Sequence, residues 1–207
     1  MEHHLSVTAR FGFASGVAAF AASWTFFASS LLNMLGRLDD PWDVLLLAGT
    51  SLAMAVFFLM QSASVHAWVP RGQGPWSVLG LSFAVVYTVL AAIVYVTWMF
   101  APTPEEAFAF GPQSFIYMLD ATCYAFSGLA ALMSSRAFTG DGLARVVRVF
   151  GIASGLAAVP VFLSYVFNDI WLGVGWQLTV PTYALLAALH MRERERAASS
   201  VPISDAI

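Results

Sequence analysis

The stretch LGLSFAVVYTVLAAIVYVTWMF, residues 79–100, contains no charged side chain and no regular alternation of apolar and polar residues. A helix that crosses a membrane needs roughly 20 mostly apolar residues, because each residue adds about 1.5 Å along an axis that must cross about 30 Å of hydrocarbon. A strand of a membrane barrel would instead alternate with a period of two residues. This stretch therefore predicts a transmembrane helix.

The rest of the chain has the same character. Of its 207 residues, 59% are hydrophobic and 10% are charged, whereas soluble domains carry about 25% charged residues. We predict an all-α polytopic membrane protein, a bundle of six transmembrane helices over residues 11–191 between a cytoplasmic N-terminus (1–10) and a cytoplasmic tail (192–207). The expected spans are Phe11–Leu35, Val44–Val69, Trp76–Ala101, Ser114–Ser135, Val146–Phe167 and Ile170–Met191.

The boundary between the fifth and sixth spans is marked only by Asn168 and Asp169. The other connections contain proline or glycine, which end helices and favour turns. A single bent, re-entrant pair of helices would give a similar pattern at residues 168–169. Both arrangements are compatible with the sequence here.

The arginines predict the orientation, since cytoplasmic loops collect positive charge and the chain contains no lysine. With six spans, only Arg37 falls on the side away from the termini. The remaining arginines share the side of the termini: Arg10, Arg71, Arg136, Arg145, Arg148, Arg192, Arg194 and Arg196. Both termini are therefore expected in the cytoplasm, with the protein in the bacterial inner membrane and the lipid bilayer as its surroundings.

Several functional classes receive no support from the sequence. The net charge of −3 and the lack of a basic tract argue against nucleic-acid binding. The chain has no Walker A, GxGxxG, GxSxG or HExxH motif, and its one cysteine, Cys123, lies in an apolar run. We therefore expect a protein that is not an enzyme and has no cofactor and no metal site.

Asp120 is the one acidic residue placed well inside a predicted span, where an ionised carboxylate is costly without a partner or water. Helical spacing puts Tyr117, Asp120, Tyr124 and Ser127 on one face, which we expect to point inward. Other spans carry polar residues at comparable depth: Asn33, Ser51, Tyr95, Thr97, Ser164, Tyr165 and Gln177. Asp120 then either faces a polar cavity or joins helices as a buried hydrogen-bonding group.

These positions predict a cavity in the outer leaflet that binds a small molecule, as in a carrier or a transporter subunit. Asp120, Tyr124 and Gln177 would supply its polar groups. Tyr95, Trp98 and Trp176 would supply its aromatic walls. A cationic or polar ligand would suit the carboxylate.

Two other functional classes remain open. His66 and His190 fall near the cytoplasmic ends of two spans and would be the axial ligands if the protein were a haem-binding redox protein, although interfacial histidines are the simpler interpretation. A structural or accessory subunit of a larger complex would instead pack through small residues. The GxxxG motifs at Gly12/Gly16 and Gly151/Gly155 suit either homo- or hetero-oligomers or packing within the chain.

The segment RVVRVFGIASG (145–155) and the final run ending in HMRERER (190–196) resemble small uncharacterised bacterial membrane proteins of domain-of-unknown-function families. That resemblance implies a multi-spanning helical fold and no particular site residue. The six-span layout is also similar to the substrate-binding subunits of vitamin importers. Ala14, Ala18 and Ala22 would correspond to their small-residue partner face.

The arginine distribution generates a topology prediction. A reporter active only in the cytoplasm should give signal when fused after Ile207. A reporter active only outside should give signal from the loop at residues 103–110. The opposite result at either site would contradict six spans with cytoplasmic termini.

Overall fold

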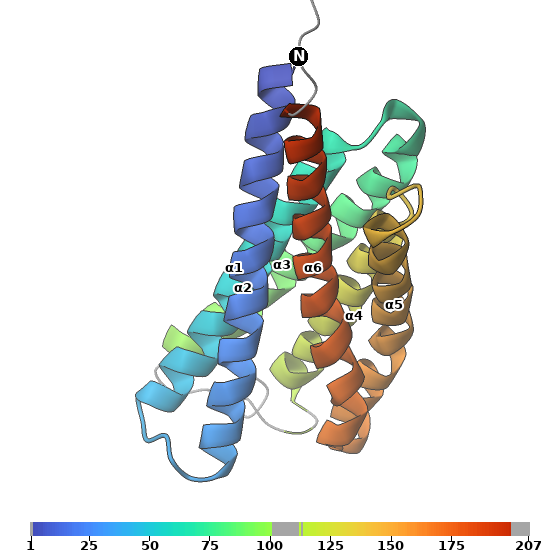
Figure 1. Cartoon of the computed structure of the whole chain (residues 1–207). Coiled ribbons are helices and arrows are strands. Elements are labelled where there is room, and N and C mark those ends of the chain that lie inside the picture. Colours follow the sequence, from blue (N-terminus) through green and yellow to red (C-terminus); the bar gives the residue numbers. More distant parts are fainter. Residues whose placement is uncertain (1, 101–111, 113, 200–207) are drawn as a thin grey trace, which may run out of the picture.

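Each predicted span is a helix in the computed structural model of the chain, which describes residues 2–100, 112 and 114–199 (Figure 1). The helices are α1 (Glu2–Met34), α2 (Trp42–Trp68), α3 (Gly74–Phe100), α4 (Phe115–Ser135), α5 (Leu143–Phe167) and α6 (Ile170–Ser199), with a 3-10 turn, η1 (Arg71–Gln73), between α2 and α3. The described residues contain no strand. All six helices are long and apolar enough to span a membrane, which confirms the predicted fold class.

The six helices form a ring in chain order. Each helix packs against the next one along the chain, and α1 closes the ring by packing against α6. The start of α1 and the end of α6 lie side by side, at what we call the terminal end of the bundle (Figure 1). The connections α1–α2 and α5–α6 lie at the other end, which we call the opposite end. The side of the membrane that each end faces stays a prediction.

The first and last helices extend beyond the predicted spans at the terminal end. α1 begins at Glu2 rather than Phe11, and α6 continues past Met191 to Ser199. The polar flanks of the two helices bind each other there. The Arg10 Nε donates to Glu195 Oε1 at 2.7 Å, and the Ser6 hydroxyl donates to the same oxygen at 2.8 Å. This pairing explains why both segments remain helical outside the apolar runs.

A tight turn separates α5 from α6. Asn168 adopts the left-handed conformation, with φ 52° and ψ 42°, and ends α5. The Asp169 backbone N–H then donates to the Ser164 carbonyl at 2.9 Å, and the Asp169 carboxylate accepts from the Trp171 N–H at 3.0 Å. The last two spans are therefore two full helices, and the bent re-entrant alternative is wrong. The predicted end of the third span at Ala101 lies outside the described residues.

Both GxxxG motifs pack within the chain. A Cβ added at Gly16 would lie 2.6 Å from Gln61 Nε2 on α2 and 2.7 Å from Ala188 Cβ on α6. A Cβ at Gly155 would lie 2.7 Å from Leu132 Cδ2 on α4. These distances are far below ordinary contact, so a side chain cannot be added without moving a helix. The glycines let the helix backbones approach closely, as small residues do in membrane proteins.

Small residues are frequent in the interior of the bundle, beside a set of buried aromatic side chains. The buried set includes many alanines and serines, for example Ala48, Ala55 and Ser154. Large apolar side chains such as Leu156, Val159 and Trp171 are exposed. Several buried serines donate to backbone carbonyls of their own helix; the Ser154 hydroxyl, for instance, donates to the Phe150 carbonyl at 2.7 Å. Many small residues inside and many large apolar side chains outside suit a bundle surrounded by lipid.

Close packing at Gly16 leads to a stability prediction. Gly16→Val should lower the thermal midpoint of the protein in mild detergent, since overpacking a tight contact costs roughly 1–3 kcal/mol. Gly49→Val is the matched control, because Gly49 also lies within a helix and a Cβ there meets nothing within 4 Å. Equal midpoints for the two variants would contradict the close contact between α1, α2 and α6.

Candidate functional site

Asp120 is buried inside the bundle, with 1% of its surface exposed. The Tyr95 hydroxyl of α3 donates to its Oδ1 at 2.7 Å, and the Tyr165 hydroxyl of α5 donates to its Oδ2 at 2.6 Å. Both distances are typical of hydroxyl–carboxylate bonds, which are about 2.5–2.7 Å. In the part of the chain that the structure describes, Asp120 makes no ion pair. Its carboxylate thus joins α3, α4 and α5 through two tyrosines.

A third tyrosine extends this hydrogen-bond network. The hydroxyl oxygens of Tyr95 and Tyr124 lie 2.7 Å apart. A phenol has one proton to donate, and Tyr95 donates its proton to Asp120. Tyr124 must therefore be the donor to Tyr95, so the bonds run from Tyr124 through Tyr95 to the carboxylate.

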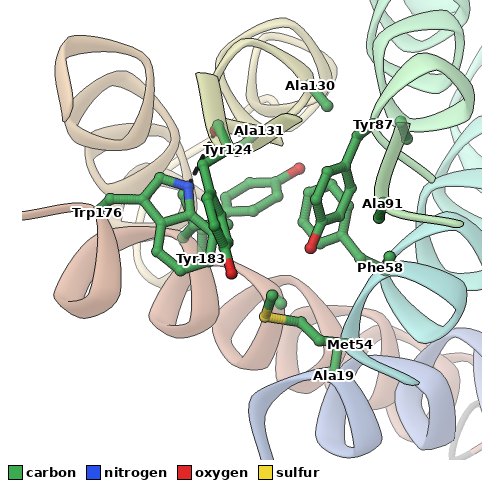
Figure 2. Packing of buried hydrophobic residues seen from close by; sticks show 14 of the residues in the cluster. Ala19, Met54, Phe58, Tyr87, Ala91, Tyr124, Ala130, Ala131, Trp176 and Tyr183 are labelled. Atoms are coloured by element: carbon green, nitrogen blue, oxygen red, sulfur yellow. Dashed lines mark hydrogen bonds between the residues drawn. The ribbon is translucent and has the colours of Figure 1, made fainter. Parts of the chain in front are cut away.

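Trp176 of α6 packs against the same part of α4. Its indole N–H donates to the Ser127 hydroxyl at 2.8 Å and to the Tyr124 carbonyl at 3.1 Å. Figure 2 shows the indole nitrogen directed toward Tyr124, with the two rings close together. The ring centroids of Tyr124 and Trp176 are 4.5 Å apart at 72°, an edge-to-face contact. These contacts fix the position of both aromatic side chains.

A cavity of about 450 Å³ lies next to this network, between α1, α4, α5 and α6 in the half of the bundle away from the termini. Its volume is within the ~300–1,000 Å³ range of small-molecule sites. Its lining consists of Phe26, Phe27, Ser30, Leu31, Met34, Tyr117, Tyr124, Val161, Ser164, Tyr165, Asn168, Ile170, Gly173, Val174, Trp176 and Gln177. No acidic or basic side chain is in this lining.

The structure places three of the six predicted site residues on the cavity wall, namely Tyr124, Trp176 and Gln177. Asp120 and Tyr95 do not line the cavity but lie behind its tyrosines, to which they are hydrogen-bonded. Trp98 is partly buried, packs against the core and does not line the cavity. The predicted neighbours Asn33, Ser51 and Thr97 are likewise absent from the lining.

Sequence reasoning missed the contribution of α1 to the cavity. Phe26, Phe27, Leu31 and Met34 line it, and apolar residues of this kind give no signal among the other apolar residues of a span. Tyr165 had a signal, since it is a tyrosine at the depth of Asp120, but only the packing of α5 against α4 shows that the two meet.

The two histidines considered for haem make separate contacts. His66 Nδ1 lies 2.9 Å from the Ser77 hydroxyl of α3. The His190 ring packs edge-on against Trp68 and Phe138, with centroids 5.6 Å away from each. The haem interpretation stays an untested prediction.

Comparisons of the chain with models of protein families, with curated proteins and with solved structures find no match. The resemblances to uncharacterised bacterial membrane proteins and to vitamin-importer subunits therefore stay predictions.

The buried carboxylate generates a second stability prediction. Asp120→Ala leaves the hydroxyls of Tyr95 and Tyr165 without their acceptor, which costs about 1–3 kcal/mol for each unsatisfied group. Asp120→Asn keeps the size and one acceptor oxygen, so its loss should be smaller. Unfolding by a denaturing detergent, followed by circular dichroism, measures both losses. Asp141→Ala is the control, because Asp141 is exposed at the terminal end; a loss as large as that of Asp120→Ala would contradict the network.

Proposed function

We propose that this protein binds a small molecule in the 450 Å³ cavity between α1, α4, α5 and α6, and acts in the bacterial inner membrane as a carrier or a transporter subunit. The observation that carries the proposal is a cavity of ligand size whose aromatic wall is held in place by hydrogen bonds. Trp176 is fixed by Ser127, and Tyr165 by Asp120. A preformed wall lowers the cost of ordering side chains when a ligand binds.

The lining favours a ligand with a large apolar or aromatic part. Phe27, Leu31, Val161 and Val174 are among its apolar residues. The polar groups are few and are provided by amides and hydroxyls, such as Gln177 and Ser164. Few polar groups on a mainly apolar wall are typical of sites for organic molecules.

An accessory subunit of a larger complex is the second candidate. The faces around both GxxxG motifs are already occupied within the chain. Ala14, on the expected partner face of α1, is exposed and remains available to another protein. An isolated complex of stable stoichiometry would favour this candidate.

Two glycines of α6 allow a direct test of the cavity. Gly173 lines it, and a Cβ there would lie 3.4 Å from the nearest atom, the Ser164 hydroxyl oxygen, so a leucine should enter the cavity without disrupting the helix contact. Gly175 is two residues further on and does not line the cavity; its Cβ would lie 3.9 Å from Ala157 Cβ. Gly173→Leu and Gly175→Leu therefore add the same side chain to the same helix.

We expect native mass spectrometry of protein released from mild detergent to show a bound organic molecule in the wild type and in Gly175→Leu. The same mass should be lost in Gly173→Leu, because its leucine occupies the space. Retention of the molecule in Gly173→Leu would place it elsewhere and contradict the proposal.

A further inference from the structure

We propose that the ligand of this cavity is an organic cation, such as a substituted ammonium group attached to an apolar body. This inference rests on the proposed function and specifies the chemistry of the same site. Three features of the described residues support it: most of the hydrogen-bond donors of the wall are occupied, its surface is aromatic, and a carboxylate lies directly behind it.

Most polar groups of the wall already donate their protons inside the protein. The Gln177 amide donates to the carbonyl and hydroxyl oxygens of Ser23 at 3.2 and 3.1 Å. The Tyr117 hydroxyl donates to Asn168 Oδ1 at 3.2 Å, and the Ser164 hydroxyl donates to the Val161 carbonyl at 2.6 Å. A ligand in this cavity therefore meets mainly acceptor oxygens and ring faces, and these suit a positively charged group better than an anion.

Aromatic rings form much of the wall. Tyr117 and Tyr165 have centroids 4.6 Å apart, and Tyr124 lies 6.2 Å from Tyr165 and 4.5 Å from Trp176. Phe26 continues the group, with its centroid 6.5 Å from that of Tyr124. The negative faces of such rings attract quaternary and protonated amines, and the attraction is larger when water is excluded.

Asp120 supplies the charge that the wall lacks. Its carboxylate is one hydrogen bond from Tyr165 and two from Tyr124, both of which line the cavity. In a low-dielectric interior a carboxylate without a cation is costly, and a positive ligand nearby offsets that cost. No basic side chain among those that line the cavity competes for this role.

The charges at the opposite end of the bundle agree with a cationic ligand. Asp39, Asp40 and Asp43 lie at the α1–α2 connection and Asp169 lies between α5 and α6, where Arg37 is the one basic residue among the described positions. An acidic surface near a cavity raises the local concentration of cations and repels anions.

The test compares two probes of the same shape. Benzyltrimethylammonium and neopentylbenzene differ in one atom, a positively charged nitrogen in place of a carbon. Equilibrium dialysis measures the binding of each probe to the full chain in nanodiscs of zwitterionic lipid, with protein-free nanodiscs to correct for partition into lipid. We expect the wild type to bind the cation at least about tenfold more tightly than the neutral probe.

Two variants locate the source of this selectivity. Asp120→Asn removes the charge with little change of shape and should weaken the cation about tenfold while leaving the neutral probe within about twofold. Phe26→Leu removes a ring that takes part in no side-chain hydrogen bond, and should weaken the cation about threefold. Phe26→Leu keeps the test decisive if Asp120→Asn does not fold.

The outcomes separate the two proposals. Equal affinity of the wild type for both probes, abolished by Gly173→Leu, would overturn the cation inference and leave the proposed function standing. Cation selectivity that survives Gly173→Leu would place the cation outside the cavity and overturn the inference. Binding of neither probe to the wild type would overturn the inference. The proposed function would then be judged by the copurified molecule and its loss in Gly173→Leu.

Discussion

The contact between α1 and α6 is the constraint on which the rest of the bundle depends. Gly12 and Gly16 bring α1 against Met191, Ala188 and the Ala184 carbonyl of α6, and this contact closes the ring of helices. Further along α1, large side chains replace the small ones. At the opposite end, Phe26, Leu31 and Met34 face a cavity rather than a helix backbone. Figure 1 shows the two helices together at the terminal end and further apart at the other. α1 therefore closes the ring of helices at the terminal end and lines the cavity at the opposite end.

The number and type of the helices were predictable because each span is a continuous apolar run of sufficient length. The ends of the helices were less predictable. The helical segments before Phe11 and after Met191 are polar, and they are stabilised by each other through Arg10 and Glu195, which are far apart in the sequence. Hydropathy reports transfer into lipid and carries no information about such pairing.

The candidate site was predictable along one helix and unpredictable between helices. Helical spacing correctly put Asp120, Tyr124 and Ser127 on a buried face of α4. Which residues of the other helices contact this face depends on the rotation and depth of each helix, and the sequence does not give these. Tyr165 meets Asp120, whereas Trp98, at a similar expected depth, packs against the core away from the cavity. Successive residues lie about 100° apart around a helix axis. The spacing within one helix therefore does not determine which residues of the neighbouring helix face it.

The distribution of charge links the fold to its surroundings. At the terminal end, arginines are frequent, and Arg192 and Arg136 lie over the rings of Phe13 and Trp76 at 4.3 and 5.8 Å from their centroids. The opposite end carries mainly aspartates, and Asp120 lies in the adjacent half of the bundle, where its position on α4 puts it close to the cavity. A buried carboxylate near an acidic surface is disfavoured by its neighbours as well as by burial. Two tyrosine hydroxyls compensate for part of this cost, and a cation in the cavity would compensate for more. Next to the arginines of the terminal end, an ion pair would neutralise the carboxylate. Asp120 would then attract a cationic ligand much less.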